Sequence, residues 1–181
     1  YLVEHVQVPA RRVLMDEINW NDRLIAIKGG RGVGKTDFLL NYAKEVRAKN
    51  PESSQRMLYV NLNDFYFTQH SLVEFAGRFV AAGGTTLLID QAFKYPDWSY
   101  ELSQCYYRYP NLRIIFIASS VMRLVEGNQD IGSIVHPYNL RGFSFREYLN
   151  VTLGLKLPVF SLDDILHRHV DIARRITQII S

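Results

Sequence analysis

The sequence predicts a three-layer α/β domain built on a five-stranded parallel sheet. Short apolar runs of strand length alternate along the chain with amphipathic segments of helix length. A helix between successive strands implies parallel strands joined by right-handed crossovers. The chain has 181 residues, of which 48% are hydrophobic and 22% charged, so it can bury a core and is not disordered.

Five apolar runs are expected to form the strands of this sheet. In chain order they are Leu24–Lys28, Met57–Leu62, Thr85–Asp90, Leu112–Ala118 and Ser133–Leu140. The fifth is the least regular, because Pro137 removes a hydrogen-bond donor. The apolar run at residues 114–118 is far too short to span a bilayer, so we expect no membrane partner.

Helices are expected between and after these strands. The spacing of apolar residues and of capping residues predicts helices over Asp37–Ala48, Ser71–Ala82 and Trp98–Tyr109, a short one from Ser119-Ser120 to Gly127, one from Ser144 through Leu149, and one from Ser161 to the end. Residues 50–54 read as a loop. We expect a core over 1–156 and the beginning of a helical lid or linker over 157–181. A chain that ends inside a helix suggests a further C-terminal region.

A glycine-rich segment between the first strand and the first long helix matches G-x-x-x-x-G-K-[ST], the phosphate-binding loop. Its glycines let backbone N–H groups converge on an anion, and the helix N-terminus adds partial positive charge. Lys35 can reach the β- and γ-phosphates, and the Thr36 hydroxyl can bind Mg²⁺. The alternative is a glycine-rich turn with an incidental lysine. The predicted nucleotide-binding residues are Gly29, Gly30, Arg31, Gly32, Val33, Gly34, Lys35, Thr36 and Asp37.

Asp90 ends an apolar strand, at the carboxyl edge where a parallel sheet binds its ligand. With Thr36 it is the predicted Mg²⁺ site; the alternative is a strand-end aspartate that caps the next turn. The acidic strand does not directly follow the helix of the phosphate loop, since another strand and helix intervene. That layout is typical of the additional-strand class of P-loop NTPases, which includes AAA-type ATPases. The guanine-binding string N-K-x-D does not occur, so we expect ATP.

Several strings together carry a family resemblance. They are residues 31–36 (RGVGKT), 59–64 (YVNLND), 88–91 (LIDQ), 94–98 (KYPDW), 109–116 (YPNLRIIF), the pair Ser119-Ser120 and 143–149 (FSFREYL). Over about residues 10–150 the chain resembles the prokaryotic AAA_14 family of AAA-type ATP-binding proteins. The resemblance implies an ATPase core followed by a helical lid and a further domain. It implies ATP and Mg²⁺ as cofactors, and little about the biological task.

Two departures from the family pattern affect catalysis. The family usually has Asp-Glu where this chain has Asp90-Gln91. A glutamine can orient the attacking water but cannot take its proton. The family also has Thr-Gly before the serine pair, where this chain has Ile117-Ala118. With Lys35 and Gln91, Ser119 is the third predicted catalytic residue, as a polar sensor; its alternative is a helix N-cap.

Other polar residues allow two interpretations each. Asn61 and Asn63, after the second strand, fit either a polar switch beside Asp90 or a turn, and Asp64 fits a loop better than a second acidic group. Arg123 and Arg141 could balance transition-state charge, although each is more often a solvated or structural arginine.

The leading functional hypothesis is an ATP-hydrolysing domain that drives a conformational change. The alternative is a nucleotide-binding switch or scaffold with negligible hydrolysis, because Gln91 replaces the usual glutamate. A net charge of +3 without a long basic run supports nucleic-acid binding only weakly. We expect an unidentified protein partner, a possible homo-oligomer and, since Cys105 is the single cysteine, a cytoplasmic location.

Overall fold

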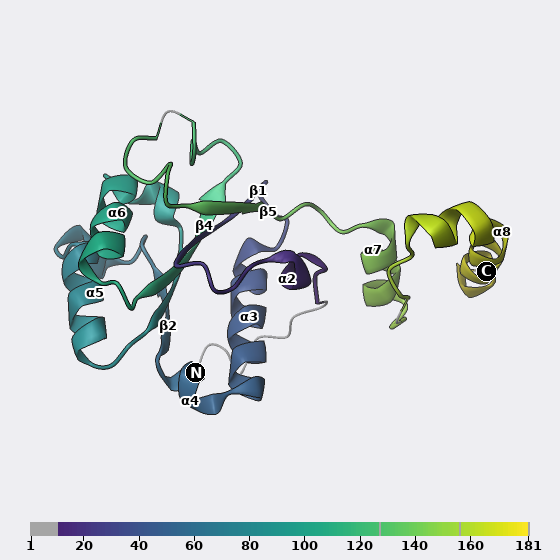
Figure 1. Cartoon of the computed structure of the whole chain (residues 1–181), viewed down its shortest axis with the longest axis horizontal. Coiled ribbons are helices and arrows are strands. Elements are labelled where there is room, and N and C mark those ends of the chain that lie inside the picture. The colour runs from purple at the N-terminus through teal and green to yellow at the C-terminus, as the bar shows by residue number, and fades with distance from the viewer. Residues whose placement is uncertain (1–10, 127, 156, 181) are drawn as a thin grey trace. The chain divides into compact units, whose positions relative to one another are not determined.

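The structure is a computed structural model that describes residues 11–126, 128–155 and 157–180. The chain divides into two compact units, Tyr1–Phe143 and Ser144–Ser181. The first unit holds the sheet, and the second holds helices α7 (Phe145–Thr152) and α8 (Leu162–Ile180) (Figure 1). The sequence predicts a boundary near residue 156, whereas the compact units divide before α7.

The expected five-stranded parallel sheet is confirmed. Its strands are β1 (Leu24–Gly29), β2 (Met57–Asn61), β3 (Thr86–Asp90), β4 (Arg113–Ser119) and β5 (His136–Asn139), in the order β2-β3-β4-β1-β5. Every described pairing is parallel. Strand β4 separates β1 from β3, as the additional-strand layout requires. The end of the phosphate-loop strand and the end of the acidic strand therefore meet at one edge of the sheet.

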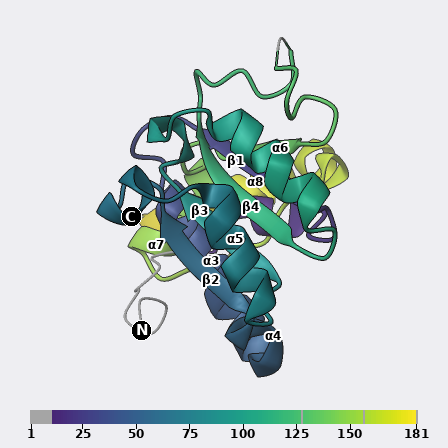
Figure 2. The same ribbon diagram turned by 90° about the vertical axis from the view of Figure 1, so that its left-hand side faces the viewer.

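Helices cover both faces of the sheet. Alternate residues of β1 point to opposite sides, so Leu24 and Ala26 join the core beneath α5 (Leu72–Ala81) and α6 (Trp98–Arg108). Ile25 and Ile27 pack with α2 (Leu14–Glu17) and α3 (Lys35–Lys49) on the other side. Figure 2 shows α5 and α6 lying across one face of the sheet. This sandwich buries the three central strands, β3, β4 and β1, and leaves their carboxyl ends open to a ligand.

Two helix starts that were predicted from a serine N-cap are confirmed. The Ser71 side chain caps α5, and Ser144 with Glu147 forms a complete capping box at α7. The prediction of a loop at residues 50–54 is wrong, because α4 (Pro51–Gln55) lies there. The Asn50 side chain accepts a hydrogen bond from the Ser53 N–H, and Pro51 stands in the first turn, where it suits a helix.

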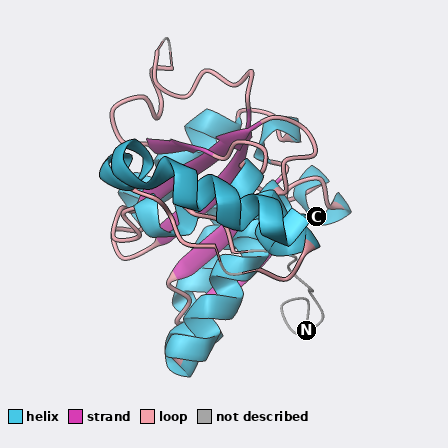
Figure 3. Ribbon diagram, turned by 90° about the vertical axis from the view of Figure 1, so that its right-hand side faces the viewer, coloured by secondary structure: helices cyan, strands magenta, loops and turns pink. Residues whose placement is uncertain are grey.

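The connection from β4 to β5 differs most from expectation. No described residue between Ser119 and His136 is helical. The prediction of a short helix after Ser119-Ser120 is therefore wrong. Figure 3 draws this connection as loop. Strand β5 is also shorter than predicted and begins at His136 rather than Ser133. Among the described helices, none combines the length and the apolar character that crossing a membrane would require.

Candidate functional site

The phosphate loop runs from the end of β1 to the start of α3. Gly34 immediately precedes α3 and has φ of +86°, a left-handed conformation that suits glycine. A Cβ at Gly29 would lie 2.5 Å from the Leu140 carbonyl oxygen, so that position also needs glycine. These glycines allow the compact backbone path that an anion nest needs, and a 15-residue helix begins directly after the loop.

Lys35 is held against the loop that precedes it. Its Nζ donates hydrogen bonds to the carbonyl oxygens of Gly29, at 2.9 Å, and Gly30, at 2.6 Å. Burial lowers the pKa of Lys35 below its ordinary value, and the charge of Asp90 opposes that shift. Both acceptors are neutral carbonyls, so a phosphate oxygen would be the stronger partner for this ammonium.

Asp90 is buried and its carboxylate accepts three hydrogen bonds. The Thr36 hydroxyl donates to Oδ2 at 2.7 Å, and the phenol of Tyr59 donates to the same oxygen at 2.9 Å. The Gln91 backbone N–H donates to Oδ1 at 2.6 Å. The structure therefore brings together the two residues predicted to bind Mg²⁺. Hydrogen bonds to both carboxylate oxygens hold Asp90 in this orientation.

Tyr59 is the member of this group that the sequence analysis missed. Strands β2 and β3 pair Tyr59 with Leu88 and Asn61 with Asp90, which makes Tyr59 a diagonal neighbour of Asp90. A tyrosine in an otherwise apolar strand was the available signal, because a partly buried phenol needs a partner. Burial, followed by the hydrogen bond and the charge of Asp90, raises the pKa of Tyr59.

Gln91 has a left-handed backbone, with φ of 57° and ψ of 27°. A non-glycine residue there costs of order 1 kcal/mol. Gln91 and Ser119 both line a pocket of about 720 Å³ together with the phosphate loop and Asp90. The same pocket includes Phe93 and Lys94, neither of which the sequence analysis assigned to the site. The three residues expected to be catalytic, Lys35, Gln91 and Ser119, therefore share one cavity.

Ser119 caps a turn rather than a helix. Its Oγ lies 3.5 Å from the Val121 N–H, and its own N–H donates to the Met122 sulfur at 3.1 Å. The N-cap interpretation fails because no described residue between Ser119 and His136 is helical. Ser119 lies at the end of β4 and pairs in register with Gly29, which places it at the mouth of the phosphate loop.

A second, smaller pocket of about 280 Å³ lies against the phosphate loop. It is lined by Val33, Phe38, Asn41, Phe143 and Arg12, among others. Arg12 is buried and donates to the carbonyl oxygens of Val33, at 3.1 Å, and Arg141, at 2.6 Å. Its guanidinium lies 4.5 Å from the centre of the Phe143 ring. No local pattern predicts this contact, since residues 12 and 143 are far apart in the chain.

The remaining candidates lie outside the pocket that holds Lys35 and Asp90. The Asn61 side chain accepts from the Asn63 N–H, and Asp64 caps the short helix η1 (Phe65–Thr68), so these residues build the turn after β2. Arg123 and Arg141 do not line that pocket among the described residues.

Comparison with known proteins gives one family. The model of the family AAA_14, described as "AAA domain", matches residues 21–149. No curated protein matches. A solved structure described as "Structure of C. elegans PCH-2" is similar, with 18% identity and a TM-score of 0.42; the match covers 76% of this chain and 38% of that chain. The present chain thus spans well under half of that protein.

Proposed function

Because the chain belongs to the AAA_14 family of AAA domains, we propose that it binds Mg·ATP and hydrolyses it slowly. A nucleotide-binding AAA domain is what the family and the parallel sheet support directly. The finer proposal rests above all on one observation. The Thr36 hydroxyl and the Asp90 carboxylate meet at 2.7 Å directly beside the phosphate loop.

The triphosphate would lie in the larger pocket, over the loop from Gly29 to Thr36. The loop N–H groups and the N-terminus of α3 provide donors and positive potential there. Lys35 would exchange its two carbonyl acceptors for phosphate oxygens, which form stronger, charge-assisted hydrogen bonds. The loop would thus bind the phosphates through its backbone N–H groups and the ammonium of Lys35.

The oxygen atoms of Thr36 and Asp90 fit Mg²⁺. A hydroxyl and a carboxylate are the hard oxygen donors that Mg²⁺ takes beside phosphates. When bound, the ion would neutralise charge on the phosphates. Tyr59 and the Gln91 N–H would hold the carboxylate in place when Thr36 turns its proton away from it. Asp90 would therefore be oriented before the ion arrives.

The base would lie in the smaller pocket on the other side of the loop. Phe143 offers a ring for stacking, and Asn41 offers a side-chain amide that can pair with the edge of a base. Arg12 holds the chain at Arg141 against the loop at Val33, so it would keep this pocket formed. The absence of N-K-x-D favours adenine.

Gln91 determines how fast the chain would hydrolyse ATP. Its amide can hold a water but cannot take the proton that the attacking water must lose. Positioning and charge, supplied by Lys35 and the metal, would leave slow turnover. The second candidate, an ATP-loaded switch with negligible turnover, is favoured by this same residue. In either case we expect a protein partner or a second copy to respond to the loaded state in the cytoplasm.

Two measurements on the same samples test the proposal. Binding of a fluorescent ATP analogue is measured with Mg²⁺ and with EDTA, and phosphate release is measured at saturating ATP against Lys35→Ala as background. Binding with slow release supports the ATPase, and binding with release equal to the background supports the switch. Failure of ATP to bind at all would contradict both.

A further inference from the structure

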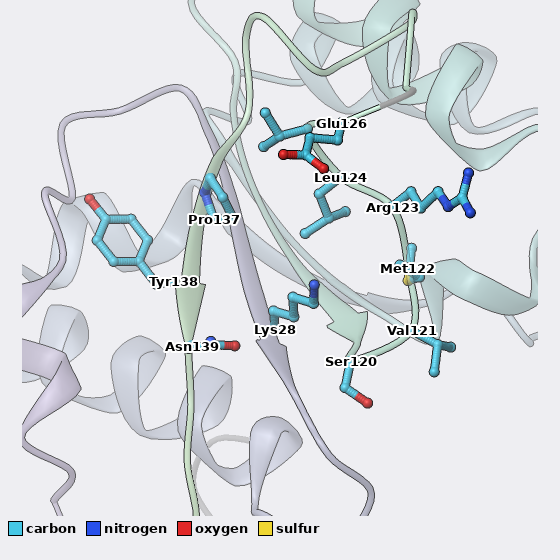
Figure 4. A pocket seen from close by; sticks show the side chains of 11 residues that line it. Lys28, Ser120, Val121, Met122, Arg123, Leu124, Glu126, Pro137, Tyr138 and Asn139 are labelled. Atoms are coloured by element: carbon cyan, nitrogen blue, oxygen red, sulfur yellow. The ribbon is translucent and has the colours of Figure 1, made fainter.

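Another cavity, of about 800 Å³, lies beside the proposed nucleotide site and is lined by other residues. It is bounded by the end of β1, the edge strand β5 and the segment that follows β4 (Figure 4). Lys28 enters it from the face of the sheet that also carries Leu24 and Ala26, opposite α3. The volume falls within the range of small-molecule sites.

Lys28 gives this cavity a directed positive charge. Figure 4 shows its amine pointing into the cavity toward Leu124, whereas the guanidinium of Arg123 points away. Lys28 is partly buried, and no ion pair or hydrogen bond within the described chain joins its amine to another residue. A partly buried ammonium in this position would gain free energy from an acidic group that reached it.

The rest of the wall restricts what kind of acid fits. Leu124, Met122 and Pro137 provide apolar surface beside the amine, and Leu124 is buried. Glu126 presents its carboxylate from the far end of the cavity (Figure 4). One negative charge is therefore favourable near Lys28, and a second near Glu126 is not. A polyanion such as a nucleotide is a poor fit.

We propose that this cavity binds a small molecule with one carboxylate and an apolar body. The carboxylate would accept from Lys28, and the body would lie on Leu124, Met122 and Pro137. The site is distinct from the nucleotide pocket but shares its wall. Lys28 directly precedes Gly29, and Ser120 directly follows Ser119; Gly29 and Ser119 line the nucleotide pocket and pair in register.

The first experiment uses the unmodified chain. 1-Naphthoate and its neutral counterpart 1-naphthylmethanol are titrated into ¹⁵N-labelled protein while amide shifts are followed. We expect naphthoate to shift the amides of residues 120–126 and of Tyr138 and Asn139, and not those of 30–36. The alcohol should bind about tenfold more weakly, since it lacks the charge-assisted hydrogen bond. Equal affinities, or shifts confined to residues 30–36, would overturn the proposal.

The second experiment compares two lysines on either side of the shared wall. Lys28→Met keeps the apolar stem and removes the charge, and we expect it to raise the naphthoate dissociation constant at least about tenfold. Lys35→Met makes the same change in the nucleotide pocket and should alter that constant by less than about twofold. Naphthoate binding to Lys28→Met with wild-type affinity refutes the site. If Lys28→Met does not fold, the shift map and the acid–alcohol comparison decide the question.

Discussion

The phenol of Tyr59, on β2, donates a 2.9 Å hydrogen bond to the Asp90 carboxylate, on the neighbouring strand β3. The same oxygen accepts from Thr36 at 2.7 Å. Thr36 would have to turn its proton away to offer a lone pair to a metal ion, whereas Tyr59 can keep its hydrogen bond. Tyr59 is thus the side chain that would hold Asp90 throughout metal binding.

Tyr59→Phe is expected to raise the Mg²⁺ concentration needed for half-maximal ATP binding. Loss of a residue that orients a metal ligand typically costs at least about tenfold in metal affinity. Binding of ATP in EDTA should not change, because Tyr59 does not line the nucleotide pocket. The measurement is a titration of Mg²⁺ at fixed fluorescent ATP analogue. Tyr138→Phe, which removes a phenol bonded to the Asn19 N–H, is the matched control; equal shifts in both variants would argue against a specific role.

Lys35→Ala should weaken ATP binding at least about tenfold while the chain stays folded. Within the described part of the chain the ammonium donates only to the carbonyl oxygens of Gly29 and Gly30, so its loss should hardly lower the unfolding temperature. Charge-assisted bonds to phosphate are worth about 1.5–3 kcal/mol each, which predicts at least a tenfold loss of affinity. Calorimetric titration with Mg·ATP measures this loss of affinity. Lys44→Ala, on the exposed face of α3, is the control, and wild-type affinity in Lys35→Ala would reject the site.

Gln91→Glu is expected to accelerate hydrolysis by roughly 10²–10⁴-fold, the usual contribution of a general base. ATP affinity should fall only modestly, through repulsion between the new carboxylate and the phosphates. Single-turnover hydrolysis of bound ATP compares the two forms, and Gln91→Met controls for loss of the amide without gain of a base. Equal rates for glutamine and glutamate would show that position 91 does not activate the water.

Phe143→Ala tests the position of the base. Stacking on an aromatic ring contributes about 1–3 kcal/mol per base, so ATP affinity should fall roughly tenfold, whereas affinity for inorganic tripolyphosphate should not. Phe65→Ala removes another exposed ring, which does not line this pocket, and serves as control. Competition by GTP in the same assay should be weaker than competition by ATP. GTP that binds ten times more tightly would contradict the adenine assignment.

Cys105 should resist thiol reagents in the folded chain. It is fully buried, and burial raises the pKa of its thiol to about 12 from the ordinary 9.0. At pH 8 the thiolate is then about one part in ten thousand in the folded state and about a tenth in the unfolded state. Labelling by a disulfide reagent should therefore follow unfolding by urea. Because the folded pKa is the higher one, the thiol also disfavours the fold as pH rises above about 9.

Much of the fold was predictable because it is encoded locally. Short apolar runs specified the strands, and the Ser144–Glu147 box lies within one helical turn. The phosphate loop is a run of consecutive residues, so its match predicted the positions of Lys35 and Thr36 together. The same local signals failed at α4, because residues 50–54 read as a loop although Asn50 and Pro51 also suit the start of a helix.

The sequence by itself determined the class of sheet, the phosphate loop and the acidic residue at the end of β3. Only the tertiary structure decided which distant side chains complete the site. The Tyr59–Asp90 hydrogen bond depends on the register between β2 and β3. The Arg12–Phe143 contact joins two residues that are more than a hundred positions apart in the sequence. The cavity at Lys28 depends on the path of the loop after β4. The physical reason is that each of these contacts is made across the packed layers, where no fixed spacing in the sequence relates the partners.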